Sequence, residues 1–392
     1  MNYGIVKSTI ITTVTLISIV VTQSPSYAEK VVPIVDLTTG ALSMSVTSIT
    51  KNMSDNNEAL EFWVFCPGGS GGGMGGGGMC NSPTLPSPTL TLTPNTAADV
   101  TLNMMMAPQE DGSITMGNSS FSNPYIGHTI HLHGLDMETQ YDGVPETFQA
   151  EPVNNESSVD LRNGFTYKIN SDSNNIRVDE RYIGSHMYHC HVHTVKHLEM
   201  GMYGGFVVKG SGNKANWINN SGGSFDEEWI MMLSTVDPTY HSTAAQGDSD
   251  IFADYNPKYF LVNGEEGNGI TINPLLSKTI ILAQGQTKNV VIRLMGMHST
   301  NAIFSIMSGS NKIPFTLYNI DGFALKTPST ETSVELSPGQ TKDVMITLDK
   351  AITYNPQIAF TDLRNNKEFN VKYSDSKVVS SIVKTELIVT QN

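Results

Sequence analysis

Short apolar runs recur along the whole chain, and turn-forming residues separate them. The runs are rich in Val, Ile, Phe, Tyr and Thr, and they include LEFWVFC, HTIHLHG, YGGFVVK, EWIMMLS and NVVIRLM. Segments of this length and composition favour β-strands, whereas regular helical periodicity is scarce. The pattern therefore predicts an all-β chain built of sandwiches or barrels.

A Gly-, Asn- and Ser-rich segment, KGSGNKANWINNSGGS, divides the chain near its middle. Such a composition is typical of a connection between folded units. We expect a first β domain over residues 29–209, a linker over 210–224 and a second β domain over 225–392. Both pieces have an ordinary domain size.

The first 28 residues have the pattern of a secretory signal peptide. Lys7 precedes an apolar run from Thr9 to Thr22, and Ser26-Tyr27-Ala28 ends the segment as a small-x-small cleavage site. The run is too short to span a bilayer comfortably, and no other segment is apolar enough. We therefore expect signal removal and a periplasmic or secreted chain without a membrane span; a retained anchor is the alternative.

The formal net charge is −14. Nucleic-acid binding depends on clustered positive charge, so an acidic chain of this kind is a poor candidate for it.

Three cysteines in an exported chain leave one unpaired if the other two form a disulfide. Cys66 and Cys80 are the natural pair because they bracket the flexible stretch PGGSGGGMGGGGM, over residues 67–79. Cys190 is then the odd thiol. In an oxidising compartment an unpaired thiol is a liability unless a metal occupies it.

The histidines are concentrated: eight of the ten lie between His128 and His197. Side chains alternate between the two faces of a strand. In GHTIHLHG and SHMYHCHVH, this alternation predicts that His128 and Cys190 share one face of a strand pair. It places four imidazoles on the other face: His131, His133, His189 and His191.

A thiolate, two imidazoles and a weak thioether form the ligand set of a blue-copper electron-transfer site. The segment HCHVHTVKHLEMGM supplies Cys190, His197 and Met202, and His128 supplies the second imidazole. Zinc is the competing metal, because cysteine and histidine also suit it. A structural zinc site needs neither so many imidazoles nor a methionine at this place.

The paired segments GHTIHLHG and HCHVHTVKHLEMGM resemble the copper motifs of multicopper oxidases, a family that includes laccases and metal oxidases. The segments PTLPSPTLTLTP and, further on, YFLVNG and NAIFSIMSGSNKIPFTLYNIDGFALKT are similar to other parts of that family. The resemblance implies two cupredoxin-like Greek-key domains, the second without copper ligands. It also implies copper as the cofactor, and a small-molecule or metal-ion reductant together with O₂ as substrates.

Carried over residue by residue, the resemblance assigns two kinds of copper site. The type 1 ligands are His128, Cys190, His197 and Met202. The type 2 ligand is His131, and the type 3 ligands are His133, His189 and His191. In QYDGVPET, Asp142 resembles the family's acidic segment and is a candidate proton donor.

Three departures from the family pattern matter. The gap from Cys190 to His197 is two residues longer than in laccases, so His193 is a rival ligand. We expect no third cupredoxin domain. The chain offers four histidines for a trinuclear cluster that needs eight, so a second copy or another protein would have to complete it. Otherwise the site would hold one or two coppers.

Other candidates have a plainer interpretation. The methionines Met74, Met79, Met104, Met105 and Met106 could recruit Cu(I), but we favour a flexible loop and gap-filling side chains. We expect His186 and His193 to be surface residues, and His241 and His298 to be structural.

The sequence therefore predicts an exported multicopper oxidase-like oxidoreductase. Two alternatives stay open: a copper-binding or electron-transfer protein without oxidase turnover, and a nitrite reductase-like enzyme. The incomplete histidine set favours the former, and the lack of a second-domain histidine ligand argues against the latter.

Overall fold

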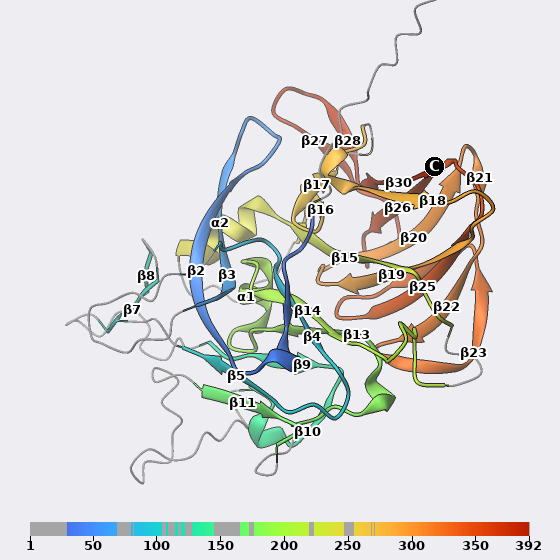
Figure 1. The fold of residues 1–392 in the computed structure, drawn as a ribbon. Coiled ribbons are helices and arrows are strands. Elements are labelled where there is room, and N and C mark those ends of the chain that lie inside the picture. The colour runs from blue at the N-terminus through green and yellow to red at the C-terminus, as the bar shows by residue number, and fades with distance from the viewer. Residues whose placement is uncertain are drawn as a thin grey trace, which may run out of the picture.

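The computed structural model confirms an all-β fold (Figure 1). It describes residues 30–391 with gaps at 69–79, 81, 104–106, 109–113, 117–118, 122–127, 145–164, 172–175, 219–222, 247–254, 268 and 270. The expected signal segment lies outside the described residues, as do all five methionines named above. The predicted domain boundaries stay predictions.

Two sheets face each other in the first half of the chain. The first sheet has the order β1 (Ile34–Asp36), β4 (Ser87–Leu92), β14 (Tyr203–Val208), β13 (Gly184–His189) and β9 (His131–His133). The second has the order β10 (Asp136–Met137), β12 (Ile176–Arg177), β11 (Phe165–Ile169), β5 (Ala98–Leu102), β2 (Leu42–Asn52) and β3 (Ala59–Pro67). A small separate sheet contains β6 (Ala107–Pro108), β7 (Ile114–Met116) and β8 (Ser119–Phe121).

The second half repeats the two-sheet plan. One sheet has the order β17 (Glu265–Gly267), β16 (Tyr259–Val262), β15 (Glu227–Val236), β19 (Lys288–Gly296), β25 (Thr341–Leu348), β22 (Phe315–Ile320) and β23 (Phe323–Glu331). The other has the order β18 (Ser277–Leu282), β30 (Glu386–Gln391), β26 (Thr353–Thr361), β20 (Asn301–Ser308) and β21 (Asn311–Lys312), with β24 (Ser333–Leu336) on β20 and β29 (Ile382–Lys384) on β26. A hairpin joins β27 (Asn370–Lys372) to β28 (Val378–Ser380).

Helices are few and short among the described residues. The α-helices are α1 (Thr194–Glu199) and α2 (Pro238–Gln246), which pack against each other. The 3₁₀ turns are η1 (Leu37–Thr39), η2 (Thr139–Tyr141), η4 (Glu180–Tyr182) and η5 (Pro274–Leu276). No described helix has the length and apolar character to cross a membrane.

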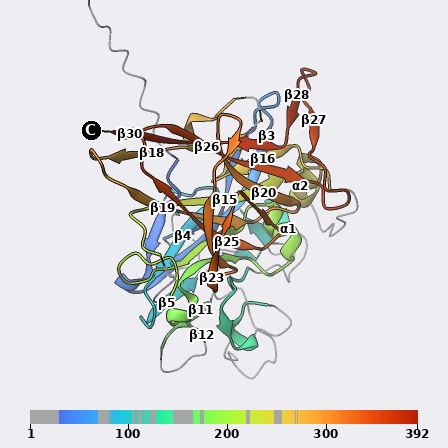
Figure 2. The ribbon, with the colours of Figure 1, turned by 90° about the vertical axis from the view of Figure 1, so that its right-hand side faces the viewer.

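Each half has its own apolar core, and a further apolar cluster lies where the two halves pack side by side. The quarter turn in Figure 2 brings the second half toward the viewer. Strand β3 shows how this works: Trp63 and Phe65 enter the core of the first half, whereas Phe62 and Val64 enter the contact between the halves. Strands buried on both faces read as continuous apolar runs, which explains LEFWVFC and EWIMMLS.

A buried charged network also crosses this contact. Arg293 is only 1% exposed, and its Nε lies 2.6 Å from Glu228 and its Nη1 3.3 Å from Asp343. The Asp343 carboxylate accepts hydrogen bonds from the backbone N–H of Ser185 (3.1 Å) and from its hydroxyl group. The second half therefore holds the first residues of β13, the strand that leads to Cys190.

Part of segment 210–224 is packed: Ala215 and Asn216 are buried, whereas residues 211–213 and 217 are exposed. The backbone of Ala215 pairs with that of Gly223, and the Asn319 side chain donates to the carbonyl of Ala215 at 2.7 Å.

Candidate metal centre

Cys190, His128 and His197 come together in the interior of the first half. Cys190 Sγ lies 3.0 Å from His197 Nδ1 and 3.8 Å from His128 Nδ1, and one donor atom from each residue falls within 4.8 Å of the others. All three side chains are buried. Cys190 is the free cysteine, since Cys66 and Cys80 form a disulfide with Cα atoms 5.5 Å apart.

A tight reversal of the chain brings His197 back to Cys190. His193 adopts a left-handed conformation (φ 44°) and caps α1, and its carbonyl accepts the backbone N–H of His197 at 3.0 Å. The His193 ring lies partly exposed, 6.2 Å from the His197 ring, and is not part of the close triad. The structure therefore places His197, rather than its rival, beside the thiol.

Met202 is fully buried and belongs to the same apolar core cluster as Cys190. Its backbone N–H donates to the His197 carbonyl (2.9 Å), and its own carbonyl accepts from the Cys190 N–H (3.1 Å). Gly201 makes this return possible, because it has φ +104° and a Cβ there would lie 2.8 Å from Leu85 and 3.2 Å from the Trp63 carbonyl.

The opposite face of the same strands carries a second cluster. His131 pairs with His189 in register between β9 and β13. Neighbouring rings on this face have centroids 5.1–5.9 Å apart, and they belong to His131, His133, His189 and His191. The alternation expected from HxH and HCH is thus the arrangement that the structure has.

Hydrogen bonds orient three of these four rings. His131 Nδ1 lies 2.6 Å from the Asp142 carbonyl, and His189 Nδ1 lies 2.9 Å from the Cys190 carbonyl. His191 Nδ1 lies 3.2 Å from the Thr194 hydroxyl. An Nδ1–H that donates in this way leaves Nε2 as the nitrogen that can bind a metal.

Asp142 therefore contacts the cluster through its backbone carbonyl. Its carboxylate accepts the backbone N–H of Val144 at 2.8 Å. The contact between the Asp142 carbonyl and His131 Nδ1 orients the His131 ring.

Burial sets the protonation of the donor atoms. Desolvation lowers the pKa of His128 and that of His189 to about 3. Both imidazoles therefore stay neutral, and each keeps a nitrogen lone pair that can bind a metal. Desolvation raises the pKa of the Cys190 thiol to about 12. Metal binding at Cys190 would therefore displace a proton.

The second half of the chain contacts the four-histidine cluster, which the sequence did not predict. A Cβ at Gly339 would lie 3.5 Å from His133 Cε1, and the charge of Asp321 opposes the lowering of the His133 pKa that burial causes. The sequence near Asp321 shows only a turn-forming pair, Asp321-Gly322, and this pair does not indicate a contact with His133. Residues in opposite halves of the chain make contact without leaving a local pattern.

One expectation about the remaining histidines is wrong. His186 is 1% exposed rather than a surface residue, and its Nε2 lies 2.8 Å from the Tyr182 carbonyl. It is buried because the turn at Gly322 packs against its ring. His241 and His298 are buried as structural residues should be: His241 contacts the Glu61 carbonyl, and His298 Nδ1 lies 2.9 Å from that of Thr300.

Residues 81–211, which contain both clusters, match the family profile described as "Multicopper oxidase". This match assigns residues 81–211 to the multicopper oxidase family. The match supports an oxidoreductase, with copper, the metal predicted from the ligand set, as its cofactor. No curated protein sequence matches the chain.

Solved structures share the fold. A multicopper oxidase crystal structure is 16% identical, with a TM-score of 0.53, and the match covers 89% of this chain and 88% of the other. The blue copper oxidase of Nitrosomonas europaea is 19% identical (TM-score 0.54; 89% and 85% covered). Fet3p, described as a multicopper oxidase that functions in iron import, is 16% identical (TM-score 0.55), and the match spans 52% of its length. At these identities the likeness extends to the fold alone.

Proposed function

We propose that the chain is an exported oxidase with a type 1 copper held by His128, Cys190, His197 and Met202. The observation that carries the proposal is the buried triad, whose nitrogen and sulfur donors lie within 4.8 Å of one another. Two neutral imidazoles and one thiol suit copper. The residue that carries the thioether, Met202, is buried, and backbone hydrogen bonds join it to His197 and Cys190.

The four-histidine cluster is the proposed type 2 and type 3 site, with His131 as the type 2 ligand. Bound copper would supply one-electron chemistry and the binding of O₂. Cys190 is covalently joined to His189 and His191, so an electron that reaches its sulfur has a short bonded route to the other face. Asp142 orients His131, and its carboxyl group is the proposed proton donor for the oxygen that is reduced.

Four imidazoles are half of what a trinuclear cluster requires. The two histidines of the second half are buried and hydrogen-bonded to carbonyl groups, so neither offers itself to the cluster. We propose that a second copy of the chain, or another protein, supplies the missing ligands. If none does, a copper-handling or electron-transfer role without oxidase turnover follows, and the histidine count favours that alternative.

The test is copper stoichiometry together with electron paramagnetic resonance on the purified, copper-loaded chain. Type 1 copper plus further copper, with O₂ consumption in the presence of a reductant, supports the oxidase. Type 1 copper alone, without O₂ consumption, supports the electron carrier. A chain that binds copper without a type 1 signal contradicts both.

A further inference from the structure

His133 differs from the other three rings of the four-histidine cluster. His131, His189 and His191 each have a hydrogen-bond partner at Nδ1. Within the described part of the chain, neither ring nitrogen of His133 makes a hydrogen bond. A histidine that binds a metal usually donates its other N–H to a carboxylate, a carbonyl group or water, and this bond fixes the ring. For His133 that group has to come from the part of the molecule that faces it.

The second half of the chain faces His133. His133 pairs in register with Met187 on β13, so the two side chains project from the same face of the strand pair. Met187 belongs to the apolar cluster between the halves. Gly339, in the turn between β24 and β25, comes closest to the ring, because a Cβ there would lie 3.5 Å from His133 Cε1. Turns of the second half therefore form the wall of the cluster on the His133 side.

Asp321 supplies a carboxylate to this wall. It lies in the turn between β22 and β23, and a Cβ at Gly134, the residue after His133, would lie 3.5 Å from its carbonyl oxygen. Burial lowers the pKa of His133, and the negative charge of Asp321 opposes this lowering. Both the backbone packing and the charge therefore place Asp321 beside His133.

Backbone contacts fix the position of Asp321 relative to β13. The Asp321 N–H donates to the Thr341 carbonyl at 2.9 Å, and Asp321 Oδ1 accepts the Thr341 N–H at 2.9 Å. The Thr341 hydroxyl donates to the carbonyl of Ser185 at 2.7 Å. Ser185 lies on β13, the strand that also carries Met187 and His189. The carboxylate is thus held in place, and its Oδ2 accepts no hydrogen bond from the described residues.

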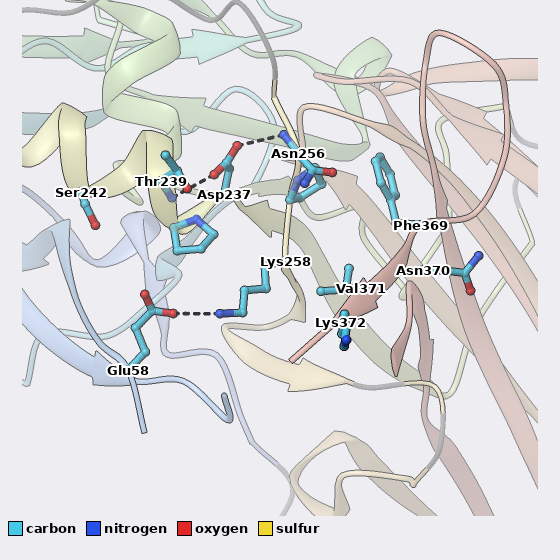
Figure 3. Close-up of a pocket in the computed structure, with 12 residues that line it drawn as sticks. Glu58, Asp237, Thr239, Ser242, Asn256, Lys258, Phe369, Asn370, Val371 and Lys372 are labelled. Atoms are coloured by element: carbon cyan, nitrogen blue, oxygen red, sulfur yellow. Dashed lines mark hydrogen bonds and ion pairs between the residues drawn. The ribbon is translucent and has the colours of Figure 1, made fainter. Parts of the chain in front are cut away.

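A carboxylate that only caps a turn is bonded differently, as Asp237 shows. It lines a cavity of about 540 Å³ formed by three segments: the β2–β3 hairpin, the start of α2 with the residues before β16, and the β27–β28 hairpin. In Figure 3, its Oδ1 accepts the backbone N–H of Thr239 (2.9 Å) and its Oδ2 accepts that of Asn256 (2.8 Å). Both oxygens of Asp237 are occupied by backbone donors, whereas Asp321 keeps one oxygen for another donor.

We propose that Asp321 is a positioning residue for His133: its Oδ2 accepts the N–H of the ring nitrogen that does not bind copper. A small rotation of the ring or one bridging water completes this bond. The bond fixes the tautomer of His133 and the direction of its other nitrogen, as carboxylate–histidine pairs do at metal sites. A residue of the second half thus orients a ligand in the first. The inference rests on the proposed four-histidine copper site.

Two substitutions separate this role from a structural one. Asp321→Asn keeps an oxygen for the Thr341 N–H, but it puts an NH₂ donor in place of Oδ2, and asparagine tolerates the left-handed backbone there (φ 52°). Asp321→Ala removes both oxygens. The control is Asp375→Asn, at an exposed turn aspartate that accepts the backbone N–H of Lys377 at 2.9 Å. If Asp321 only held its turn, Asp321→Asn would behave like the wild type.

The metal-free chain reports on the pair directly. Nitrogen-15 NMR of labelled histidine near neutral pH distinguishes the two tautomers, and the signal lost in His133→Ala is that of His133. In the wild type and in Asp375→Asn, His133 should be held in one tautomer. Both Asp321 variants should lose this preference, because no acceptor then faces the ring. Circular dichroism checks that all variants are folded.

Copper binding is the second readout. Chelator competition followed by electron paramagnetic resonance measures the affinity for copper outside the type 1 site. Both Asp321 variants should bind this copper about 10- to 100-fold more weakly, with an unchanged visible band. An unchanged tautomer or an unchanged copper affinity in Asp321→Asn overturns the inference, even where Asp321→Ala is impaired. If the wild type binds no copper beyond type 1, the four-histidine copper site is refuted instead, and the tautomer still decides whether Asp321 orients His133.

Discussion

Cys190 Sγ and His197 Nδ1 lie 3.0 Å apart, although one residue follows the last residue of a strand and the other lies in a helix. His193 has a left-handed backbone and precedes the helix that begins at Thr194, so seven positions suffice to bring the two donor atoms together. Three of the four proposed type 1 ligands, Cys190, His197 and Met202, therefore come from one short segment, and only His128 has to be brought by the fold.

Replacing the sulfur is the most direct test of this site. Cys190→Ser should abolish the intense thiolate-to-copper absorption in the visible, because the charge-transfer donor is gone, while the fold is retained. The absorption spectrum of copper-loaded protein measures the change, with circular dichroism as the check on folding. An unchanged visible spectrum would refute copper ligation by Cys190.

The two clusters should be separable by mutation. His131→Ala and His189→Ala should each lower O₂ consumption at least 100-fold and reduce the bound copper, because their rings belong to the four-histidine face. The visible band should persist, because neither side chain belongs to the triad. Copper analysis and oxygen-electrode rates check this.

The matched control for these variants is His193→Asn. Its ring stands outside both clusters, and asparagine tolerates the left-handed conformation of this position. We expect unchanged copper content, spectrum and rate. Loss of the visible band in this control would indicate that His193 is the ligand.

The buried network between the halves should matter for stability. Asp343→Ala removes one of the two carboxylates that pair with Arg293 and removes the acceptor of the Ser185 N–H, which should cost about 3–5 kcal/mol in the free energy of unfolding. Urea denaturation measures it. The control is the exposed Arg364, which pairs with Asp362, and Arg364→Ala should cost no more than about 1 kcal/mol. Equal costs would contradict the assigned role of the network.

His298 should make folding sensitive to acid. Burial lowers the pKa of His298 to about 4 in the folded chain, whereas the same side chain has a pKa near 6.5 in the unfolded chain. Its neutral form is fully favourable above pH 6.5, and stability is lost as the pH falls from there toward 4, because only the unfolded chain then takes up the proton. At pH 5 the loss is about 2 kcal/mol.

His298→Gln removes this titrating group. Urea unfolding at pH 7 and pH 5 should show a stability difference about 2 kcal/mol smaller in the variant than in the wild type. Equal differences in the two proteins would mean that His298 does not resist protonation in the folded chain.

The spacing of residues along the sequence predicted much of the candidate metal centre. The alternation in HTIHLH and HCHVH is a property of strands alone, so the sequence suffices to assign His131, His133, His189 and His191 to one face and Cys190 to the other. The all-β class and the family followed from the runs and motifs in the same way, and both are confirmed.

What only the tertiary structure decided involves residues far apart in the chain. His186 is buried because a turn at Gly322 covers it, and His133 has Gly339 as a neighbour because the two halves pack together. The cavity at Asp237 needs three separate segments. Strand periodicity and turn spacing act within about ten residues and can be read from the chain, whereas contacts between the halves arise from apolar burial that has no direction and leaves no local signature.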